Sequence, residues 1–284
     1  MAIEKVNILG AGIMGMGIAQ ALAQQGLAVT ICDLEKPILE KGLERTRQNL
    51  DSLVKKEKIT KEEADKIISR IKTTTKIEDI TTADLIIEAV SENMEVKKKV
   101  FAQLDGLCPS TTILASNTST LSPTEIASAT KRPDKVIGMH WFNPAPVMRL
   151  IEVVAGAETS KETIQAVMEF SRQVGKTPVR VNEAPGGIVS RILRGYLNTA
   201  VEVLAEGVAT AEDIDTAMKL GANFPMGPFE LLDLIGIDIH TINSDALAHE
   251  LGDLKYHPPA LLRKMVRAGH LGRRTGRGFY DYTK

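Results

Sequence analysis

His140 and Glu152 are the residues whose chemical types best suit catalysis by proton transfer. An imidazole takes up and releases a proton near neutral pH, and a carboxylate beside it would orient the ring and favour its charged form. The pair is therefore a candidate general base with its orienting partner. The alternative is a core histidine that is bonded to the backbone and a glutamate that is merely exposed.

Two neighbouring strands must position this pair. His140 lies in the run 136–142 and Glu152 in the run 148–154, and the link between them is short and contains prolines. A parallel crossover needs about a dozen residues or more, so the two strands are predicted to be antiparallel. Centring the turn on Pro146 puts His140 and Glu152 opposite each other. Cross-strand partners have Cβ atoms about 5 Å apart, which is within reach of a hydrogen bond between the two side chains.

A second chemical feature begins at the N-terminal strand, where the apolar run 6–9 leads into the turn Gly10-Ala11-Gly12-Ile13-Met14-Gly15. This is a G-x-G-x-x-G pattern followed by helical spacing, as in dinucleotide-binding sites. Gly10 allows the tight turn, Gly12 lets the backbone approach a pyrophosphate, and Gly15 lets the helix pack on the strand. The N–H groups that open the helix would face the phosphates.

A second apolar run ends at Asp33. This acid stands at the distance from the glycine turn that a ribose ligand requires, and it would accept hydrogen bonds from the ribose hydroxyls of an adenosine. Its charge would repel a 2′-phosphate. The sequence therefore predicts that NAD is bound in preference to NADP.

The charged stretch 34–72 predicts a helical hairpin in which Thr60 is the N-cap of the second helix. Asn49, Ser52 and Lys56 are spaced so that they share one helix face. A solvated helix end is the ordinary explanation of such a charged tip. The functional alternative is an arm that holds the anionic tail of a ligand.

Two further strands, predicted over 83–90 and 112–116, end in polar residues. The carboxyl ends of parallel strands face the ligand cleft, so residues 91–93 and the hydroxyl-rich segment 117–123 are predicted to lie on the functional edge. Helix capping is the alternative explanation for residues 91–93. Lys97 follows one turn later and, judged by its position alone, would be exposed to solvent.

The composition excludes several classes of function. Lys and Arg total 35 against 36 Asp and Glu, which gives a net charge of −1 and makes nucleic acid an unexpected partner. Cys32 and Cys108 have no metal-ligand spacing and suit a reducing compartment. Residues 1–5 lead almost directly into the first predicted strand, so we expect no apolar leader, and no apolar run reaches membrane-spanning length. We therefore expect a cytoplasmic protein that binds no metal and does not enter a membrane.

The 284 residues suffice for about two domains. Residues 1–184 are predicted to form a Rossmann-type NAD-binding domain, an α/β fold with a mostly parallel sheet and a helical-hairpin insertion. The boundary between the two domains is predicted at the segment Pro185-Gly186-Gly187, because proline and glycine interrupt regular structure. Residues 185–284 are predicted to form an all-α domain for substrate binding and dimerisation. The helix 188–205 is apolar on more than one side, which is typical of a helix shared between cores or between subunits, and we expect a homodimer.

Segments along nearly the whole chain resemble the L-3-hydroxyacyl-CoA dehydrogenase family, and most closely its short-chain bacterial 3-hydroxybutyryl-CoA dehydrogenases. The matching segments are 10–15, 115–119, 138–144, 218–221, 225–228 and 276–280. The resemblance implies reversible, NAD-dependent oxidation of (S)-3-hydroxybutyryl-CoA to acetoacetyl-CoA, within fatty acid and butanoate metabolism.

The resemblance also implies roles for single residues. It makes His140 the catalytic base and Glu152 its partner, and it places Ser119 against the reacting oxygen and near both substrate and cofactor. The other residues that it places near the cofactor are Asp33, Glu92, Lys97, Asn143 and Arg274. Asn49 and Lys56 match positions at which the family binds coenzyme A.

One segment departs from the family pattern. Ser190 stands where the family has an asparagine that contacts the substrate, and Gly187 replaces an aromatic residue. A serine hydroxyl still donates a hydrogen bond to the reacting oxygen, but it lacks the paired donor and acceptor of an amide. The departure bears on turnover and acyl chain length more than on reaction type. Two alternatives stay open: a 3-hydroxy-acid or sugar-acid dehydrogenase that needs no coenzyme A, and a catalytically silent NAD-binding protein.

Overall fold

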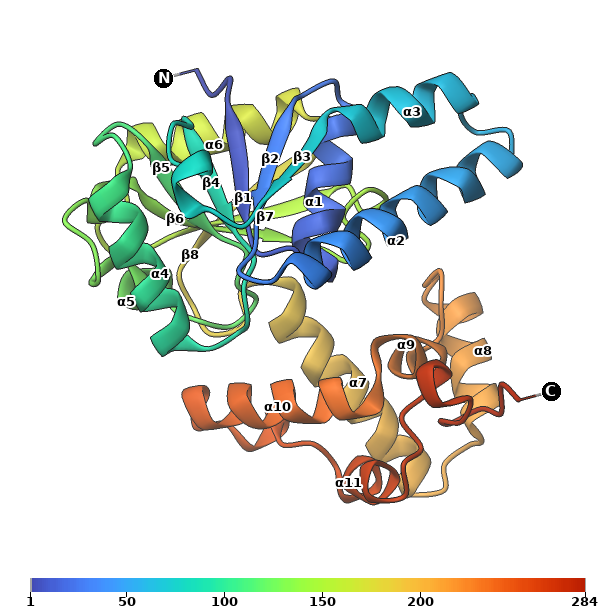
Figure 1. Cartoon of the computed structure of the whole chain (residues 1–284). Helices are drawn as coiled ribbons and strands as arrows, with labels where there is room; N and C mark the ends of the chain where they lie inside the picture. The colour runs from blue at the N-terminus through green and yellow to red at the C-terminus, as the bar shows by residue number, and fades with distance from the viewer. Residues whose placement is uncertain (1, 284) are drawn as a thin grey trace. The chain divides into compact units, whose positions relative to one another are not determined.

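The computed structural model describes residues 2–283 and divides into two compact units (Figure 1). Unit 1, Met1–Ala184, is an α/β unit. Unit 2, Pro185–Lys284, is built from helices with two isolated β-bridges near its end. The predicted fold class, a Rossmann-type mostly parallel sheet followed by a helical part, is confirmed. No helix in the described part of the chain is long and apolar enough to cross a membrane.

An eight-stranded sheet organises unit 1, in the order β3-β2-β1-β4-β5-β6-β7-β8. Its strands are β1 (Val6–Leu9), β2 (Val29–Cys32), β3 (Ile71–Thr74), β4 (Leu85–Glu88), β5 (Ile113–Ser116), β6 (Val136–Trp141), β7 (Leu150–Ala155) and β8 (Thr177–Asn182). Neighbouring strands are parallel except β6 and β7. Every residue of β1, β4, β5 and β6 is buried, as expected for strands covered on both faces.

Helices and their connections cover the sheet. The α-helices of unit 1 are α1 (Ile13–Gln24), α2 (Lys36–Lys55), α3 (Lys61–Ser69), α4 (Met94–Leu107), α5 (Pro123–Ala127) and α6 (Lys161–Gln173). Successive side chains of a strand point to opposite faces, so Leu85 and Ile87 of β4 enter one hydrophobic core and Ile86 enters another. Leu22 of α1 packs in the first core and Phe101 of α4 in the second. Burial on both faces holds the strand ends in fixed positions.

The predicted helical hairpin is present. Figure 1 shows α2 and α3 side by side, joined by a turn at their far end. Thr60 is the N-cap of α3: its hydroxyl accepts from the backbone N–H of Glu63, and the Glu63 carboxylate accepts from the N–H of Thr60. The hairpin ends earlier than expected, because Ile71–Thr74 forms the edge strand β3 beside β2. This strand is too short, with only Ile71 buried, to show a clear pattern in the sequence.

Unit 2 has one main hydrophobic core. Its helices are α7 (Val189–Ala205), α8 (Ala211–Gly221), α9 (Pro228–Ile235), α10 (Ile237–Leu251) and α11 (Ala260–Arg267). Leu197 of α7, Phe229 of α9 and Leu262 of α11 meet in that core. The buried Asp215 of α8 accepts from the backbone N–H groups that begin α9. A Cβ on Gly227 would lie 2.2 Å from the Asp215 carboxyl carbon, so only glycine fits at this N-cap.

His240 of α10 is fully buried in unit 2. Asn198 donates to the carbonyl groups of Tyr256 and His257, so its oxygen faces the Nε2 of His240 at 2.9 Å and accepts from it. The other ring nitrogen, Nδ1, lies 3.4 Å from the Arg194 guanidinium and can only accept. Burial and the Arg194 charge lower the pKa of His240 to about 3, so the ring is neutral in the folded protein.

We expect the protein to lose stability as the pH falls below the ordinary histidine pKa of about 6.5. In that range the unfolded chain binds a proton at His240 that the folded chain does not, and each pH unit lowers the free energy of unfolding by about 1.4 kcal/mol. The loss at about pH 5 is therefore about 2 kcal/mol. Urea unfolding followed by circular dichroism, at about pH 7.5 and about pH 5, measures it. The His240→Gln variant should lose about 2 kcal/mol less between these pH values, and an equal loss would refute the assignment.

Candidate active site

His140 and Glu152 face each other across β6 and β7, and the antiparallel register pairs them directly. The predicted pairing is confirmed. The His140 Nδ1 lies 2.9 Å from a carboxylate oxygen of Glu152, and Glu152 is 2 % exposed, so the alternative of an exposed glutamate is wrong. An ionised carboxylate only accepts, which assigns the Nδ1 proton to His140 and leaves Nε2 as the nitrogen that exchanges a proton.

The glycine turn connects β1 to α1. Gly10 has a φ of 101°, and a Cβ at this position would lie 2.6 Å from the backbone of Ala89. A Cβ on Gly15 would lie 1.8 Å from the carbonyl oxygen of Gly10, so the helix packs closely on the strand. In contrast, a Cβ on Gly12 would meet nothing within 4 Å. The space beside Gly12 and the uncapped start of α1 therefore fit a pyrophosphate.

Asp33, which follows β2, is hydrogen-bonded to the glycine turn. One carboxylate oxygen accepts from the backbone N–H of Ala11 at 2.7 Å, and the other accepts from that of Glu35 at 3.3 Å. The contact with Ala11 is not evident from the sequence. It fixes the carboxylate beside the turn, where the sequence predicts the adenosine ribose.

Glu92 holds the loop that follows β5. Its Oε1 accepts from the Thr118 hydroxyl at 2.6 Å and from the backbone N–H groups of Ser119 at 3.0 Å and Thr120 at 3.3 Å. Burial raises the pKa of the Glu92 carboxyl, but the Lys97 charge and these hydrogen bonds outweigh burial and bring the pKa below its ordinary value. Capping explains only Asn93, whose side chain accepts from the Val96 N–H of α4.

Lys97 is 0 % exposed, so the expectation of a solvent-exposed side chain is wrong. Its ammonium lies 2.7 Å and 3.0 Å from the carboxylate oxygens of Glu88 and 3.4 Å from Glu92. Glu88 is also 0 % exposed and accepts from the Ser116 hydroxyl at 2.6 Å. Sequence reasoning missed Glu88 and Ser116. The available signal was a single carboxylate within the otherwise apolar strand β4.

The other predicted site residues lie at exposed or half-buried positions. Asn49 and Lys56 lie on α2 and at its C-cap, and Lys56 forms no ion pair within residues 2–283. Asn143 is exposed just after β6. In unit 2, Ser190 lies in the first turn of α7 and is half-buried, and Arg274 forms an ion pair with Asp238 at 2.6 Å. Unit 1 thus contains two groups of predicted site residues. In the first, His140 contacts Glu152. In the second, Glu92 contacts both Lys97 and the loop that carries Ser119.

The two thiols are buried. Burial, with nearby acidic charge, raises the pKa of Cys32 to about 11. Burial likewise raises the pKa of Cys108 to about 11. Thiols in this state are poor nucleophiles. Within the described residues, no group of three His, Cys, Asp or Glu side chains is arranged to hold a metal ion.

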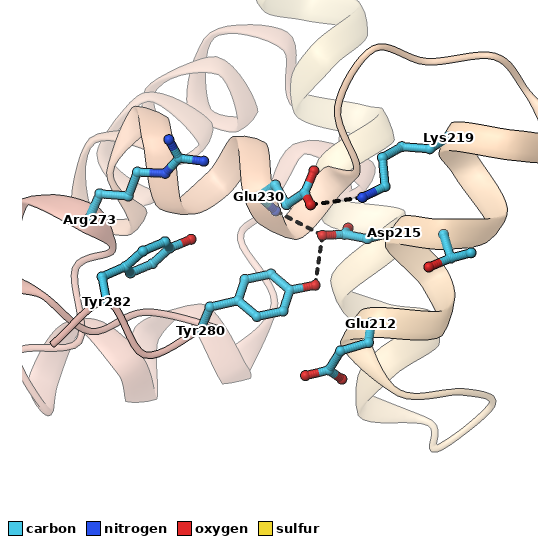
Figure 2. A pocket seen from close by; sticks show the side chains of 8 residues that line it. Glu212, Asp215, Lys219, Glu230, Arg273, Tyr280 and Tyr282 are labelled. Carbon is cyan, nitrogen blue, oxygen red and sulfur yellow. Dashed lines mark hydrogen bonds and ion pairs between the residues drawn. The ribbon is translucent and has the colours of Figure 1, made fainter. Parts of the chain in front are cut away.

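A hollow of about 360 Å³ lies in unit 2 (Figure 2). Figure 2 shows Tyr280 pointing toward Asp215 and Lys219 pointing toward Glu230, with which it forms an ion pair at 2.8 Å. The Tyr280 hydroxyl donates to the buried Asp215 at 2.8 Å, and burial raises the pKa of Tyr280. Since Asp215 also accepts from the backbone N–H groups at the start of α9, these groups are engaged in holding unit 2 together.

Comparison with known proteins covers the whole chain. Residues 5–184 match the NAD binding domain of 3-hydroxyacyl-CoA dehydrogenase, and residues 186–282 match its C-terminal domain. A 3-hydroxybutyryl-CoA dehydrogenase of Clostridioides difficile is 51 % identical, over 99 % of this chain and 100 % of the relative. A probable 3-hydroxybutyryl-CoA dehydrogenase of Bacillus subtilis (strain 168) is 48 % identical, over 99 % and 98 %. The crystal structure of (S)-3-hydroxybutyryl-CoA dehydrogenase from Ralstonia eutropha is 46 % identical, with a TM-score of 0.94 and full coverage of both chains.

Proposed function

The chain belongs to the 3-hydroxyacyl-CoA dehydrogenase family, an NAD-dependent oxidoreductase family, and from this premise we propose how its own residues carry the reaction and on which substrate. It interconverts (S)-3-hydroxybutyryl-CoA and acetoacetyl-CoA. The observation that carries this proposal is the 2.9 Å contact between His140 and Glu152, because it leaves the opposite ring nitrogen to act on a substrate proton.

The proton moves through His140. In the oxidising direction its Nε2 accepts the proton of the 3-hydroxyl, and Glu152 stabilises the imidazolium through Nδ1. In reduction the same nitrogen donates the proton. The nicotinamide cofactor, when bound, would supply the hydride acceptor in oxidation and, as NADH, the hydride donor in reduction. Ser119, with Ser190 in the family's asparagine position, donates hydrogen bonds to the oxygen as charge develops on it.

The glycine turn is proposed to hold the pyrophosphate of NAD, with Ile13 and Met14 opening the helix beside it. Asp33 binds the adenosine ribose, and Glu92, Asn143 and Arg274 lie near the cofactor. The resemblance places Lys97 near the cofactor as well, and its buried ammonium beside Glu92 supports a role that acts through Glu92.

Asp33 is expected to select NADH over NADPH. The Asp33→Ala variant should narrow the gap in kcat/KM between the two cofactors by about tenfold or more, since it removes the charge that repels a 2′-phosphate. It also removes the acceptor of the Ala11 N–H, so Asp33→Asn is the matched control that keeps an acceptor there and removes only the charge. Steady-state kinetics with both cofactors measure the ratio. An unchanged ratio in both variants would mean that this acid does not select the cofactor.

The hairpin α2–α3 is proposed to bind the coenzyme A portion of the substrate, and unit 2 is proposed to form a homodimer interface. Lys56 and Asn49, exposed near the hairpin tip, bind the coenzyme A portion. Exposed apolar side chains in unit 2, including Ile192 at 69 % and Ile242 at 66 %, support a homodimer interface. The two buried cysteines are free, which suits a cytoplasmic enzyme.

The stereochemistry of the reaction tests the proposed function. With NAD present, the protein should oxidise (S)-3-hydroxybutyryl-CoA, as seen by NADH formation, and should leave the (R) isomer essentially unreacted. A fixed base and fixed oxygen donors accept only one arrangement of hydroxyl and hydrogen at C3. Equal rates with the two isomers would contradict the proposed geometry.

A further inference from the structure

We propose that Glu88 is a positioning residue, which acts through Lys97 and Glu92 to fix the loop 117–121 that carries Ser119. The inference rests on the proposed function, because that function assigns the Ser119 hydroxyl to the reacting oxygen. Glu88 itself touches neither substrate nor cofactor in this assignment. The support comes from a continuous set of contacts within unit 1.

The first part of this set is an anchor on two central strands. Glu88 is the last residue of β4, which lies between β1 and β5. Its Oε1 accepts from the Val90 N–H at 2.7 Å, and its Oε2 accepts from the Ser116 hydroxyl at 2.6 Å, at the end of β5. A carboxylate that is wholly buried and bonded on both oxygens has little freedom to move.

Lys97 connects this anchor to Glu92. The ammonium has three N–H donors, and three carboxylate oxygens surround it: two from Glu88 and one from Glu92 at 3.4 Å. A buried ammonium is stable only when paired, so its position follows that of Glu88, the nearer carboxylate. A neutral residue in place of Glu88 would let the ammonium move toward Glu92 or lose its proton.

Glu92 connects Lys97 to the loop 117–121. One oxygen faces Lys97, while the other accepts from the backbone N–H groups of Ser119 and Thr120. The Ser119 hydroxyl lies farther away, 3.5 Å from the same oxygen, which is the long limit of a hydrogen bond. Glu92 therefore fixes the backbone of Ser119 and leaves its hydroxyl able to turn to another acceptor.

The decisive variant removes the buried pair without leaving a lone charge. Glu88→Gln alone leaves a buried ammonium with a single carboxylate and is expected to fold poorly, whereas Glu88→Gln combined with Lys97→Met replaces the ion pair by neutral groups of similar size, which proteins often tolerate. We expect the double variant to fold, to keep its KM for acetoacetyl-CoA and to lose about 10- to 100-fold in kcat, because the oxygen donor is misplaced. Hydrogen exchange at residues 117–121 should be faster.

Two further variants complete the test. Lys98→Met, on the same helix, breaks only a surface pair with Glu125 at 3.4 Å and should leave kcat and loop exchange unchanged. Ser116→Ala keeps all the charges and removes one hydrogen bond to Glu88, so it should give a smaller change in the same direction as the double variant. It carries the test if the double variant does not fold.

Wild-type kcat and wild-type loop exchange in a folded double variant, or in Ser116→Ala when the double variant does not fold, would overturn the proposal. The exchange measurement needs no substrate. Faster loop exchange in a protein whose wild type does not turn over acetoacetyl-CoA would therefore support the positioning role while refuting the proposed function.

Discussion

Replacing His140 by glutamine is expected to lower kcat about 100-fold or more while leaving the affinity for NADH unchanged. Glutamine retains a polar side chain of similar length, but it cannot accept a proton at neutral pH. The glycine turn and Asp33 are separate from the histidine in the chain and keep their own contacts. Steady-state kinetics with acetoacetyl-CoA give kcat, and fluorescence titration gives the dissociation constant of NADH.

A second histidine provides the matched control. His257 in unit 2 also lies near a carboxylate, 4.0 Å from Asp245, but its side chain is 51 % exposed. His257→Gln should leave kcat unchanged. If His140→Gln keeps the wild-type kcat, the assignment of the general base is wrong.

Replacing Glu152 by glutamine is expected to lower kcat about 100-fold or more as well. The wild-type carboxylate accepts the Nδ1 proton of His140 and so keeps the lone pair on Nε2. An amide can instead present its NH₂ group to Nδ1, which favours the tautomer with the proton on Nε2. That tautomer cannot act as a base in oxidation, and the amide does not stabilise an imidazolium.

A variant that carries both the His140 and the Glu152 substitution tests whether Glu152 acts through His140 or independently of it. If Glu152 acts through His140, then His140→Gln combined with Glu152→Gln should be no slower than His140→Gln alone, since residues that act as a unit are not additive. Rates that multiply would show that Glu152 contributes independently of the histidine. Circular dichroism confirms that each variant is folded before its kinetics are compared.

The parts of the site that depend on local pattern could be predicted from the sequence. The short link centred on Pro146 determines the register of β6 and β7, because a strand pair joined by a short turn has few alternatives. The Thr60 cap follows from the preference of threonine for N-cap positions, and the turn at Gly10 follows from the ability of glycine to adopt a positive φ.

The remainder depends on contacts between distant parts of the chain. Lys97 lies nine residues after Glu88, and its spacing on α4 gives no indication that the ammonium turns inward. Its burial becomes intelligible only when the ends of β4 and β5 are adjacent, so that Glu88 and Ser116 meet. Thr118 and Glu92, separated by 26 positions, are joined in the same way.

The backbone before Ser190 is also evident only in the structure. Ser190 is the second residue of α7, and Gly186 and Gly187, which precede this helix, both have positive φ values, of 76° and 53°. An aromatic residue would adopt that conformation at Gly187 only with strain, so the backbone here suits this chain's glycine. The effect of Ser190 on chain length remains a prediction, which acetoacetyl-CoA and its longer homologues can test.

The central claim is hydride and proton transfer on an acyl group that is carried by coenzyme A. Its most direct test is the oxidation of NADH measured side by side with acetoacetyl-CoA and with free acetoacetate. The account predicts a kcat/KM for the thioester that is about 100-fold or more above that for the free acid, because binding energy from the coenzyme A portion contributes to the rate. NADH binding without turnover of either compound would indicate a catalytically silent protein, and equal turnover of the two would contradict the claim.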